Sequence, residues 1–263
     1  PKTPKPRNYK YVYKLLLNSM SQFIAQSEKM FMLEGFKQGI RSDGRGVTDS
    51  RPFKMQRNTV PEAFGSCTLT FGQEDTQVVC AIKAEIMAPL NSEPNRGQIN
   101  FYLESSQTGR SLFVREDTAD SLKQRMQNSL ATMFANVIDR KELSIYDGEF
   151  CWNLHVDLLV FDELSMEQLD YIGLCMRAAF GSLQLPQTIA TLNNLTGKIE
   201  VGLVEEVYAD KENTDQPIIL KSSKHSPFII SVAVIRNEMT ELEDGQKLLV
   251  ILDPDQLEMQ CVD

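Results

Sequence analysis

The sequence predicts an α/β protein, more closely an α+β arrangement, in which helices cover mixed β-sheets. The order of the elements is the main observation. Several short β segments come first, and a helix, one long strand, a second helix and a final group of strands follow them. This order is typical of packed layers of sheet and helix. With 263 residues, 42% of them apolar, the chain is long enough to bury a sizeable core in one domain.

The N-terminus reads as a flexible basic arm. Its first fourteen residues, PKTPKPRNYKYVYK, carry five basic side chains, three prolines and no acid. Tyrosines alternate with lysines there, so base stacking is one interpretation, and a tail or an arm lying on a partner is the favoured one. We expect the arm to cover residues 1–26. Ser27 is the expected cap of a helix that Gly39 ends.

Short strands follow in the first half of the domain. Residues 66–71 alternate polar and apolar side chains, and residues 76–86 are rich in β-branched ones, so 72–75 should connect them as a hairpin. Residues 99–103 form another expected strand. A loop with Gly109 and two arginines is expected over residues 105–115.

Two helices and the longest strand come next. Apolar residues repeat at three and four over residues 118–140, which predicts an amphipathic helix. Strict alternation over residues 150–162 predicts a strand with one apolar face. Ser165 is the expected cap of a second helix, and Pro186 lies just past its end.

The last part of the chain should return to strands. They are expected at residues 198–207, 218–221, 228–235 and 247–252, with a turn at Asp244-Gly245. We divide the domain, residues 27–263, into halves of about 40–190 and 191–263. The sequence ends at Asp263, shortly after a strand-like segment, so the expected C-terminal closure of the fold is missing.

The amino-acid composition limits the classes of function that the chain can have. No apolar run approaches the about 20 residues of a membrane helix, so no membrane association is expected. Five widely spaced cysteines fit reduced, buried thiols in an intracellular protein. Two histidines and no CxxC argue against zinc, and neither a metal nor a cofactor is expected. The net charge is −9, so nucleic acid should be contacted through local basic loops or neighbouring subunits.

The stretch Arg41-Ser42-Asp43-Gly44-Arg45 is the most informative motif. A chain turns sharply at Asp-Gly, because glycine accepts positive φ and aspartate bonds its own backbone. Such a turn should hold the Asp43 carboxylate between two guanidiniums. A screened ion pair on a surface turn is the alternative interpretation.

Several further motifs accompany this turn. Gly65-Ser66 leads a strand to Gly72, and Trp152 lies in a long strand that ends in VDLL (156–159). The others are Thr76-x-Val78, VCAIKAE at residues 79–85, and Pro94-Asn95-x-Gly97. With these motifs, residues 27–263 resemble the RNase PH family. They are most similar to ring subunits of the eukaryotic RNA exosome, of the ribosomal RNA-processing protein 42 type.

The resemblance implies the RNase PH fold, which is like domain 2 of ribosomal protein S5. It further implies a hetero-oligomeric six-membered ring with other RNase PH-type exosome subunits, and RNA-binding cap subunits and RNA as partners. The implied location is the nucleus and nucleolus, and also the cytoplasm. Active members of the family use inorganic phosphate to degrade RNA from its 3′ end.

Two losses indicate that the phosphate site is absent. Active members place a Gly-Gly-Thr-Arg-like turn at the start of the helix after the long strand, where it would cradle phosphate. Here residues 162–167 (DELSME) hold three acids and neither glycine nor arginine. In the preceding helix, Thr118, Ala119 and Asn128 stand where active members have Arg, Thr and a second Arg.

The acidic site after the last strand is degenerate. Asp253, Asp255 and Glu258 are retained, but Met259 stands where a further acid belongs. We therefore predict no catalytic residue and a non-catalytic ring subunit that scaffolds the hexamer and guides RNA through its pore, for 3′–5′ degradation and processing, including that of rRNA. The alternatives are an active phosphate-dependent 3′–5′ exoribonuclease and, less favoured, an unrelated α/β binding protein.

Charged residues elsewhere in the chain are the remaining candidates. Arg96, Arg110 and Arg115 flank the strand at 99–103, which faces the pore in the family, and are the predicted RNA contacts; screened surface charge is the alternative. Arg41, Asp43, Gly44 and Arg45 are predicted to be a structural hallmark.

His155 and Asp157 share a strand face, and a half-buried polar face is favoured over a catalytic dyad. Lys83 and Glu85 should form cross-strand or interface ion pairs, and His225 should lie in a solvated basic loop.

Overall fold

The computed structural model describes residues 24–73, 75–106, 116–193, 197–203, 217–236, 248–259 and 261. The predicted arm therefore lies almost entirely outside the described residues, as does the turn at Asp244-Gly245. No helix in the part of the chain described is long and apolar enough to cross a membrane.

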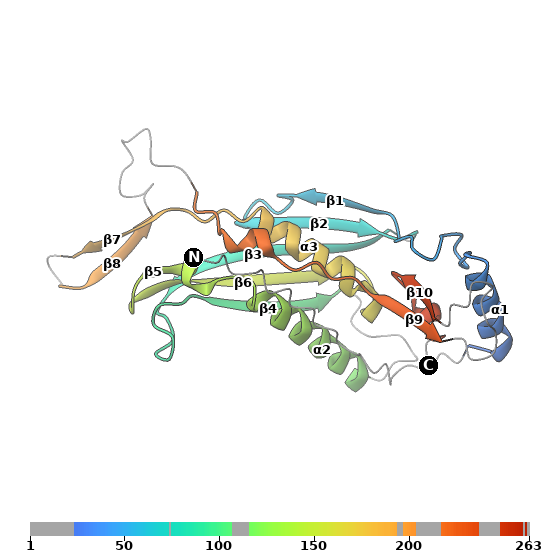
Figure 1. Cartoon of the computed structure of the whole chain (residues 1–263). Helices are drawn as coiled ribbons and strands as arrows, with labels where there is room; N and C mark the ends of the chain where they lie inside the picture. Colours follow the sequence, from blue (N-terminus) through green and yellow to red (C-terminus); the bar gives the residue numbers. More distant parts are fainter. Residues whose placement is uncertain are drawn as a thin grey trace, which may run out of the picture.

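A six-stranded mixed sheet forms the centre of the molecule (Figure 1). Its strands follow the order β1-β2-β3-β6-β4, and β5 pairs with one end of β6. Only the β4–β6 pair is parallel. The bounds are β1 (Phe53–Arg57), β2 (Gly65–Phe71), β3 (Thr76–Met87), β4 (Gln98–Ser105), β5 (Ser144–Tyr146) and β6 (Phe150–Val160). The predicted mixed sheet is confirmed.

The hairpin predicted at residues 72–75 is also confirmed. Phe71 pairs with Thr76 across it, and Gly72 has φ +79°, a value that suits a residue without a side chain. The edge strand β1 was not expected. All five of its residues are exposed, and the segment FKMQR has no β-branched residue, so its short alternation of apolar and polar side chains does not stand out as a strand.

Two helices cover one face of this sheet. α2 (Glu116–Ala135) and α3 (Leu169–Gly181) share a core with the inward side chains of β2, β3, β4 and β6. The Phe134 and Phe180 rings stack with centroids 5.8 Å apart, which brings the two helices side by side. α2 ends five residues before its predicted end, because Ile138 continues the apolar pattern from a turn, where it is buried.

The opposite face of the sheet is polar. Lys83 Nζ lies 3.2 Å from Asp157 Oδ2, and Glu85 Oε1 lies 2.8 Å from His155 Nε2, across strands β3 and β6. The predicted cross-strand pairs are confirmed. They occupy both His155 and Asp157, which makes this surface the polar strand face that the sequence favoured.

A second, smaller core lies at one end of the sheet. The helix α1 (Gln26–Lys37) packs Met32 and Phe36 onto the hairpin of β9 (Val232–Arg236) and β10 (Leu248–Leu252). Figure 1 shows α1 beside this hairpin at one end of the molecule and the hairpin of β7 (Thr188–Leu192) and β8 (Ile199–Leu203) at the other. The predicted cap Ser27 is wrong, because Ala25 is in the cap position and α1 begins at Gln26, two residues earlier than a cap at Ser27 implies.

One of the predicted strands is absent and another is shorter than expected. At residues 218–221 only one bridge forms, between Ile218 and Leu185, and the 3-10 helix η3 (Ser222–His225) follows. His225 therefore ends a helical turn rather than lying in a loop. Residues 228–231 precede β9 instead of belonging to it. The remaining short helices are η1 (Arg140–Leu143), η2 (Met166–Gln168) and α5 (Gln256–Met259).

Candidate functional site

The motif at residues 41–45 forms the predicted turn. Gly44 N donates to Arg41 O at 3.0 Å, Arg41 N donates to Arg45 O at 3.1 Å, and Gly44 has φ +82°. Asp43 Oδ1 accepts from Arg45 N at 3.0 Å, so the aspartate bonds its own backbone as expected.

The expectation that Asp43 lies between both arginines is wrong. Arg45 Nε bonds Asp43 Oδ2 at 2.5 Å, but the Arg41 side chain turns into the protein toward Glu258. Burial favours the protonated form of Asp43, yet the bonds from the Arg45 backbone and guanidinium outweigh it, so the pKa of Asp43 lies below its usual value. A buried guanidinium needs a buried partner, and Arg41 finds it in the Glu258 carboxylate.

Arg41 has all five guanidinium N–H groups hydrogen-bonded, the full donor capacity of the side chain. Nε donates to Glu258 Oε1 at 2.7 Å, and Nη2 bonds the second Glu258 oxygen. The other three N–H groups donate to main-chain carbonyls, those of Leu252 (2.8 Å), Asp253 (2.8 Å) and Asp49 (3.1 Å). Both side chains of the Arg41–Glu258 pair have 0% exposure.

Asp253 is the second carboxylate of the cluster, at the end of β10. It accepts from Arg51 Nη2 at 2.6 Å, from Arg51 N at 2.7 Å, from Tyr171 Oη at 2.6 Å and from Arg45 Nη1 at 3.1 Å. Burial by itself raises the pKa of Asp253, but the bonds from Arg51 and Tyr171 reverse this and leave the pKa below its ordinary value. Asp253 is thus held as a carboxylate.

Arg51 and Tyr171 were not predicted as site residues. The Arg51 Cζ lies 5.1 Å from the centroid of the Tyr171 ring and 5.5 Å from that of Phe71. Burial opposes the charge on Arg51, but its bonds and ion pair with Asp253 outweigh this and raise its pKa. Burial and the hydrogen bond to the Asp253 carboxylate both disfavour the ionised form of Tyr171 and raise its pKa. No local pattern marks either residue, because their partners lie far away in the sequence.

Asp255 precedes the short helix α5, and Glu258 lies within its first turn. Asp255 N donates to Glu258 Oε2 at 2.9 Å, and Glu258 N donates to Asp255 Oδ1 at 2.7 Å. Burial raises the pKa of Asp255. The three acids therefore have structural partners, two of them in buried ion pairs with arginines. The structure joins the turn at residues 41–45 and the acids at 253–258 in one cluster, named here the Arg–acid cluster.

The stretch at residues 162–167 offers little to an anion. Ser165 N donates to Gln168 Oε1 at 3.2 Å, so a side chain takes one of the N–H groups at the start of η2. Glu167 Oε2 lies 3.5 Å from Arg51 Nη1, and Asp162 Oδ2 accepts from Thr76 Oγ1 at 3.0 Å. Burial raises the pKa of Glu167. The nearby cation, Arg51, is already bound to Asp253.

Of the three predicted RNA contacts, only Arg96 lies in the described residues. It precedes β4, its side chain is 45% exposed, and its Nη1 lies 3.1 Å from Glu93 Oε1. Glu93 also pairs with Arg140 of η1 at 2.8 Å, so these three side chains together carry one more positive than negative charge. Arg110 and Arg115 lie outside the described residues. The role of all three stays a prediction.

The Arg–acid cluster is built to hold the chain together. Arg41, Arg45 and Arg51 neutralise Asp253 and Glu258 and connect the start of the domain with α3 and α5. In the part of the chain that the structure describes, no three side chains of His, Cys, Asp or Glu are grouped so that they could hold a metal ion.

Known proteins share this fold and this sequence pattern. Residues 49–186 match domain 1 of the 3′ exoribonuclease family, RNase PH. The match covers half of the chain, and the chain belongs to this family.

Its relatives include components of exosome complexes. Exosome complex component rrp43 of Schizosaccharomyces pombe is 30% identical over 155 residues, which are 58% of this chain and 56% of that protein. Exosome complex component Rrp42 of Thermococcus kodakarensis is 27% identical over 186 residues, 70% of this chain and 66% of the relative. RRP45 of Danio rerio is 27% identical over 142 residues, 53% of this chain and 34% of the relative. The match thus spans about one third to two thirds of these relatives.

Two solved structures have a similar fold. An archaeal exosome core aligns with a TM-score of 0.51 at 20% identity, over 90% of this chain and 76% of the other. The Archaeoglobus fulgidus exosome with RNA bound to the active site aligns with a TM-score of 0.54 at 21% identity, over 90% and 79%. The predicted RNase PH fold is confirmed.

Proposed function

We propose that this chain is a non-catalytic subunit of an exosome core ring. It would scaffold a six-membered ring with other RNase PH-type subunits, carry RNA-binding cap subunits, and guide RNA through the pore for 3′–5′ degradation and processing. The similarity to exosome complex components of three organisms supports the ring role. Arg96, Arg110 and Arg115 are the proposed RNA contacts.

The proposal that the chain is non-catalytic rests on the Arg–acid cluster. Phosphorolysis needs cations free to bind phosphate and acids free to hold a metal or move a proton. Here Arg41 is fully hydrogen-bonded to Glu258 and main-chain carbonyls, and Arg51 is bound to Asp253. Residues 162–167 add acids where phosphate would bind. These groups serve stability instead of chemistry.

A phosphorolysis assay tests the proposal. The purified chain, alone and assembled with the RNase PH-type subunits it binds, is incubated with 3′-labelled RNA and inorganic phosphate. We expect assembly into a ring, and the same release of nucleoside diphosphates with the wild type and with Asp255→Asn. Phosphate-dependent release that disappears with Asp255→Asn would establish the alternative, an active exoribonuclease. A chain that stays monomeric with every such subunit would refute the scaffold role.

Finer assignments belong to the same proposal. Among exosome subunits we place the chain with the ribosomal RNA-processing protein 42 type, on the motifs around residues 27–46 and 83–85. We propose one RNase PH-like domain over residues 27–263 and a location in the nucleus, nucleolus and cytoplasm. Imaging of the tagged full-length protein tests the location, and exclusion from the nucleolus would contradict it.

A further inference from the structure

The outer edge of β1 is open to solvent. β1 pairs only with β2 among the described residues. Gly72 N bonds Pro52 O, and Asn58 N bonds Ser66 O. In an antiparallel ladder with this register, Lys54 and Gln56 exchange hydrogen bonds with β2. The backbone groups that point outward, without a partner in the described chain, are those of Phe53, Met55 and Arg57.

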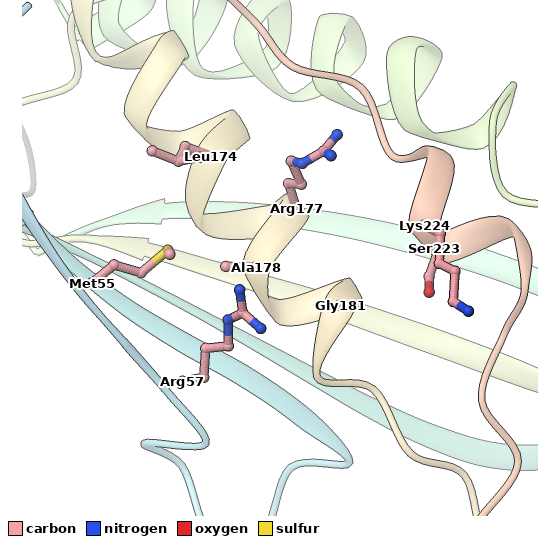
Figure 2. Close-up of a pocket in the computed structure, with 8 residues that line it drawn as sticks. All are labelled: Met55, Arg57, Leu174, Arg177, Ala178, Gly181, Ser223 and Lys224. Carbon is pink, nitrogen blue, oxygen red and sulfur yellow. The ribbon is translucent and has the colours of Figure 1, made fainter.

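A groove of about 200 Å³ runs beside this edge. Met55 and Arg57 of β1 line one wall, α3 forms the other, and Lys224 of η3 lies at one end. Figure 2 shows the Met55 and Arg57 side chains directed from β1 toward α3, with Lys224 beyond Gly181. A strand that added to β1 would therefore place alternate side chains against α3.

The groove carries three positive charges and no acid. Arg57, Arg177 and Lys224 line it from three different elements. Arg177 is fixed by a hydrogen bond from its Nη1 to Ser226 O. Arg57 and Lys224 are exposed and form no hydrogen bond or ion pair with any described residue. In a chain with net charge −9, this concentration of cations attracts a partner of opposite charge.

The groove also has an apolar lining. Met55, Leu174 and Ala178 contribute to it, and beside Gly181 there is open space where a side chain would begin. None of the lining residues is aromatic, so bases of a single-stranded nucleic acid would find no ring to stack on. Open backbone groups beside small apolar surfaces fit the recognition of an extended peptide.

We propose that this groove binds an extended acidic peptide, which adds to the edge of β1 as a further strand. Main-chain hydrogen bonds to Phe53, Met55 and Arg57 hold the peptide in register. Small apolar side chains of the peptide pack on Leu174 and Ala178, and carboxylates bond Arg57 and Lys224. The proposal is independent of the ring role, and its failure would leave that role unaffected.

A designed peptide tests the groove. The probe is a fluorescent peptide of two Val-Thr-Asp-Thr repeats, and the control has lysine in place of aspartate; binding to the full chain is followed by anisotropy. We expect only the aspartate peptide to bind, more weakly as salt rises. Arg57→Glu should weaken binding at least about tenfold. Lys54→Glu, on the same strand but the opposite face, is the matched control and should leave binding unchanged.

A second variant tests the strand geometry. Met55→Pro removes an outward N–H that β2 does not use, as proline tolerates at an edge, and should abolish binding. Hydrogen exchange at Met55 and Arg57 of the wild type should slow when the peptide binds. If the proline variant does not fold, Arg57→Glu and the hydrogen-exchange data still test whether the peptide binds at the edge of β1.

Four outcomes would overturn the proposal. They are no binding of the aspartate peptide, equal binding of the lysine peptide, unchanged binding with Arg57→Glu, and unchanged exchange at Met55. Oligouridine RNA that binds more tightly than the peptide and loses binding with Arg57→Glu would assign the groove to nucleic acid instead. Self-association lost with Arg57→Glu would assign it to a second copy of the chain.

Discussion

Arg41 and Glu258 lie 217 residues apart in the chain and form an ion pair in which both side chains are completely buried. Arg41 belongs to the turn that precedes the first sheet, and Glu258 belongs to the short helix after the last described strand. Substituting one member of a buried ion pair destabilises a protein, because the other charge stays buried without a partner, whereas replacing both members can be neutral. The pair therefore ties the two ends of the domain together.

Glu258→Gln should lower the free energy of unfolding by about 3–5 kcal/mol, because the Arg41 charge would stay buried without a carboxylate. Denaturant unfolding measures this. Glu34→Gln is the control: it breaks the exposed pair with Lys37 and should cost less than about 1 kcal/mol. The double variant Arg41→Met/Glu258→Leu should be more stable than Glu258→Gln. Equal losses of unfolding free energy in the Glu258 and Glu34 variants would show that the buried pair contributes no more to stability than the exposed pair.

Asp253→Asn should change how stability depends on pH. The pKa of Asp253 is lowered in the folded state, so the unfolded chain takes up its proton at higher pH. The stabilisation is complete above the unfolded pKa of about 3.9 and is lost as pH falls through the folded pKa. The difference in unfolding free energy between wild type and variant should thus be largest near pH 7 and shrink on acidification below about pH 4.

Glu167, Asp170 and Asp255 have raised pKa values through burial, so their contributions have the opposite sign. The contributions of Glu167 and Asp255 largely cancel between wild type and variant, whereas that of Asp170 does not cancel completely, because the Asp253 charge helps to raise its pKa. The difference therefore reports mainly on Asp253. A difference that stays constant from neutral to acidic pH would contradict the ion pairs assigned to Asp253.

Tyr171→Phe should destabilise the protein by about 1.5–3 kcal/mol, the usual value of a hydrogen bond to a charged group. The Tyr171 hydroxyl donates to Asp253 Oδ2 at 2.6 Å, while its ring would be kept by phenylalanine. Tyr146→Phe, at an exposed position, is the control and should be neutral. Thermal unfolding of both variants makes the comparison, and equal melting temperatures would refute the role of the hydroxyl.

Gly65→Ala should destabilise the contact between β2 and α3. A Cβ at this position would lie 2.7 Å from Ala179 O and 2.8 Å from Leu183 Cα, both backbone atoms. Crowding of this kind costs about 1–3 kcal/mol. Gly181→Ala, in α3 with open space around it, should instead be neutral or stabilise by up to about 1 kcal/mol. Chemical denaturation checks both, and a neutral Gly65→Ala would mean that the helix shifts without cost.

The sequence predicted the parts of the site that depend on local chemistry. The turn at Gly44 and the bond from Asp43 to its own backbone follow from two adjacent residues, and the structure has both. The partner of Arg41 could not be predicted, because Glu258 comes close only when the whole domain is folded. Arg51 and Tyr171 were missed for the same reason.

The errors in the fold have equally physical causes. β1 was missed because it is a short edge strand without a β-branched residue, and none of its side chains is buried. The end of α2 was placed too late because Ile138 is buried from outside the helix. The two central helices and the strands β2, β3 and β6 were predicted because each buries one regular face.

The Arg41–Glu258 pair also has a consequence for synthesis. A ribosome makes Arg41 long before Glu258, and at ordinary elongation rates of about 5–20 residues per second the wait lasts tens of seconds at most. Within that time the strands of the central sheet are made, up to Val160, but the arginine still lacks its carboxylate. Any nascent chain cut short before residue 258 would carry Arg41 without its carboxylate partner, and the buried site of this guanidinium could not form as it does in the complete domain.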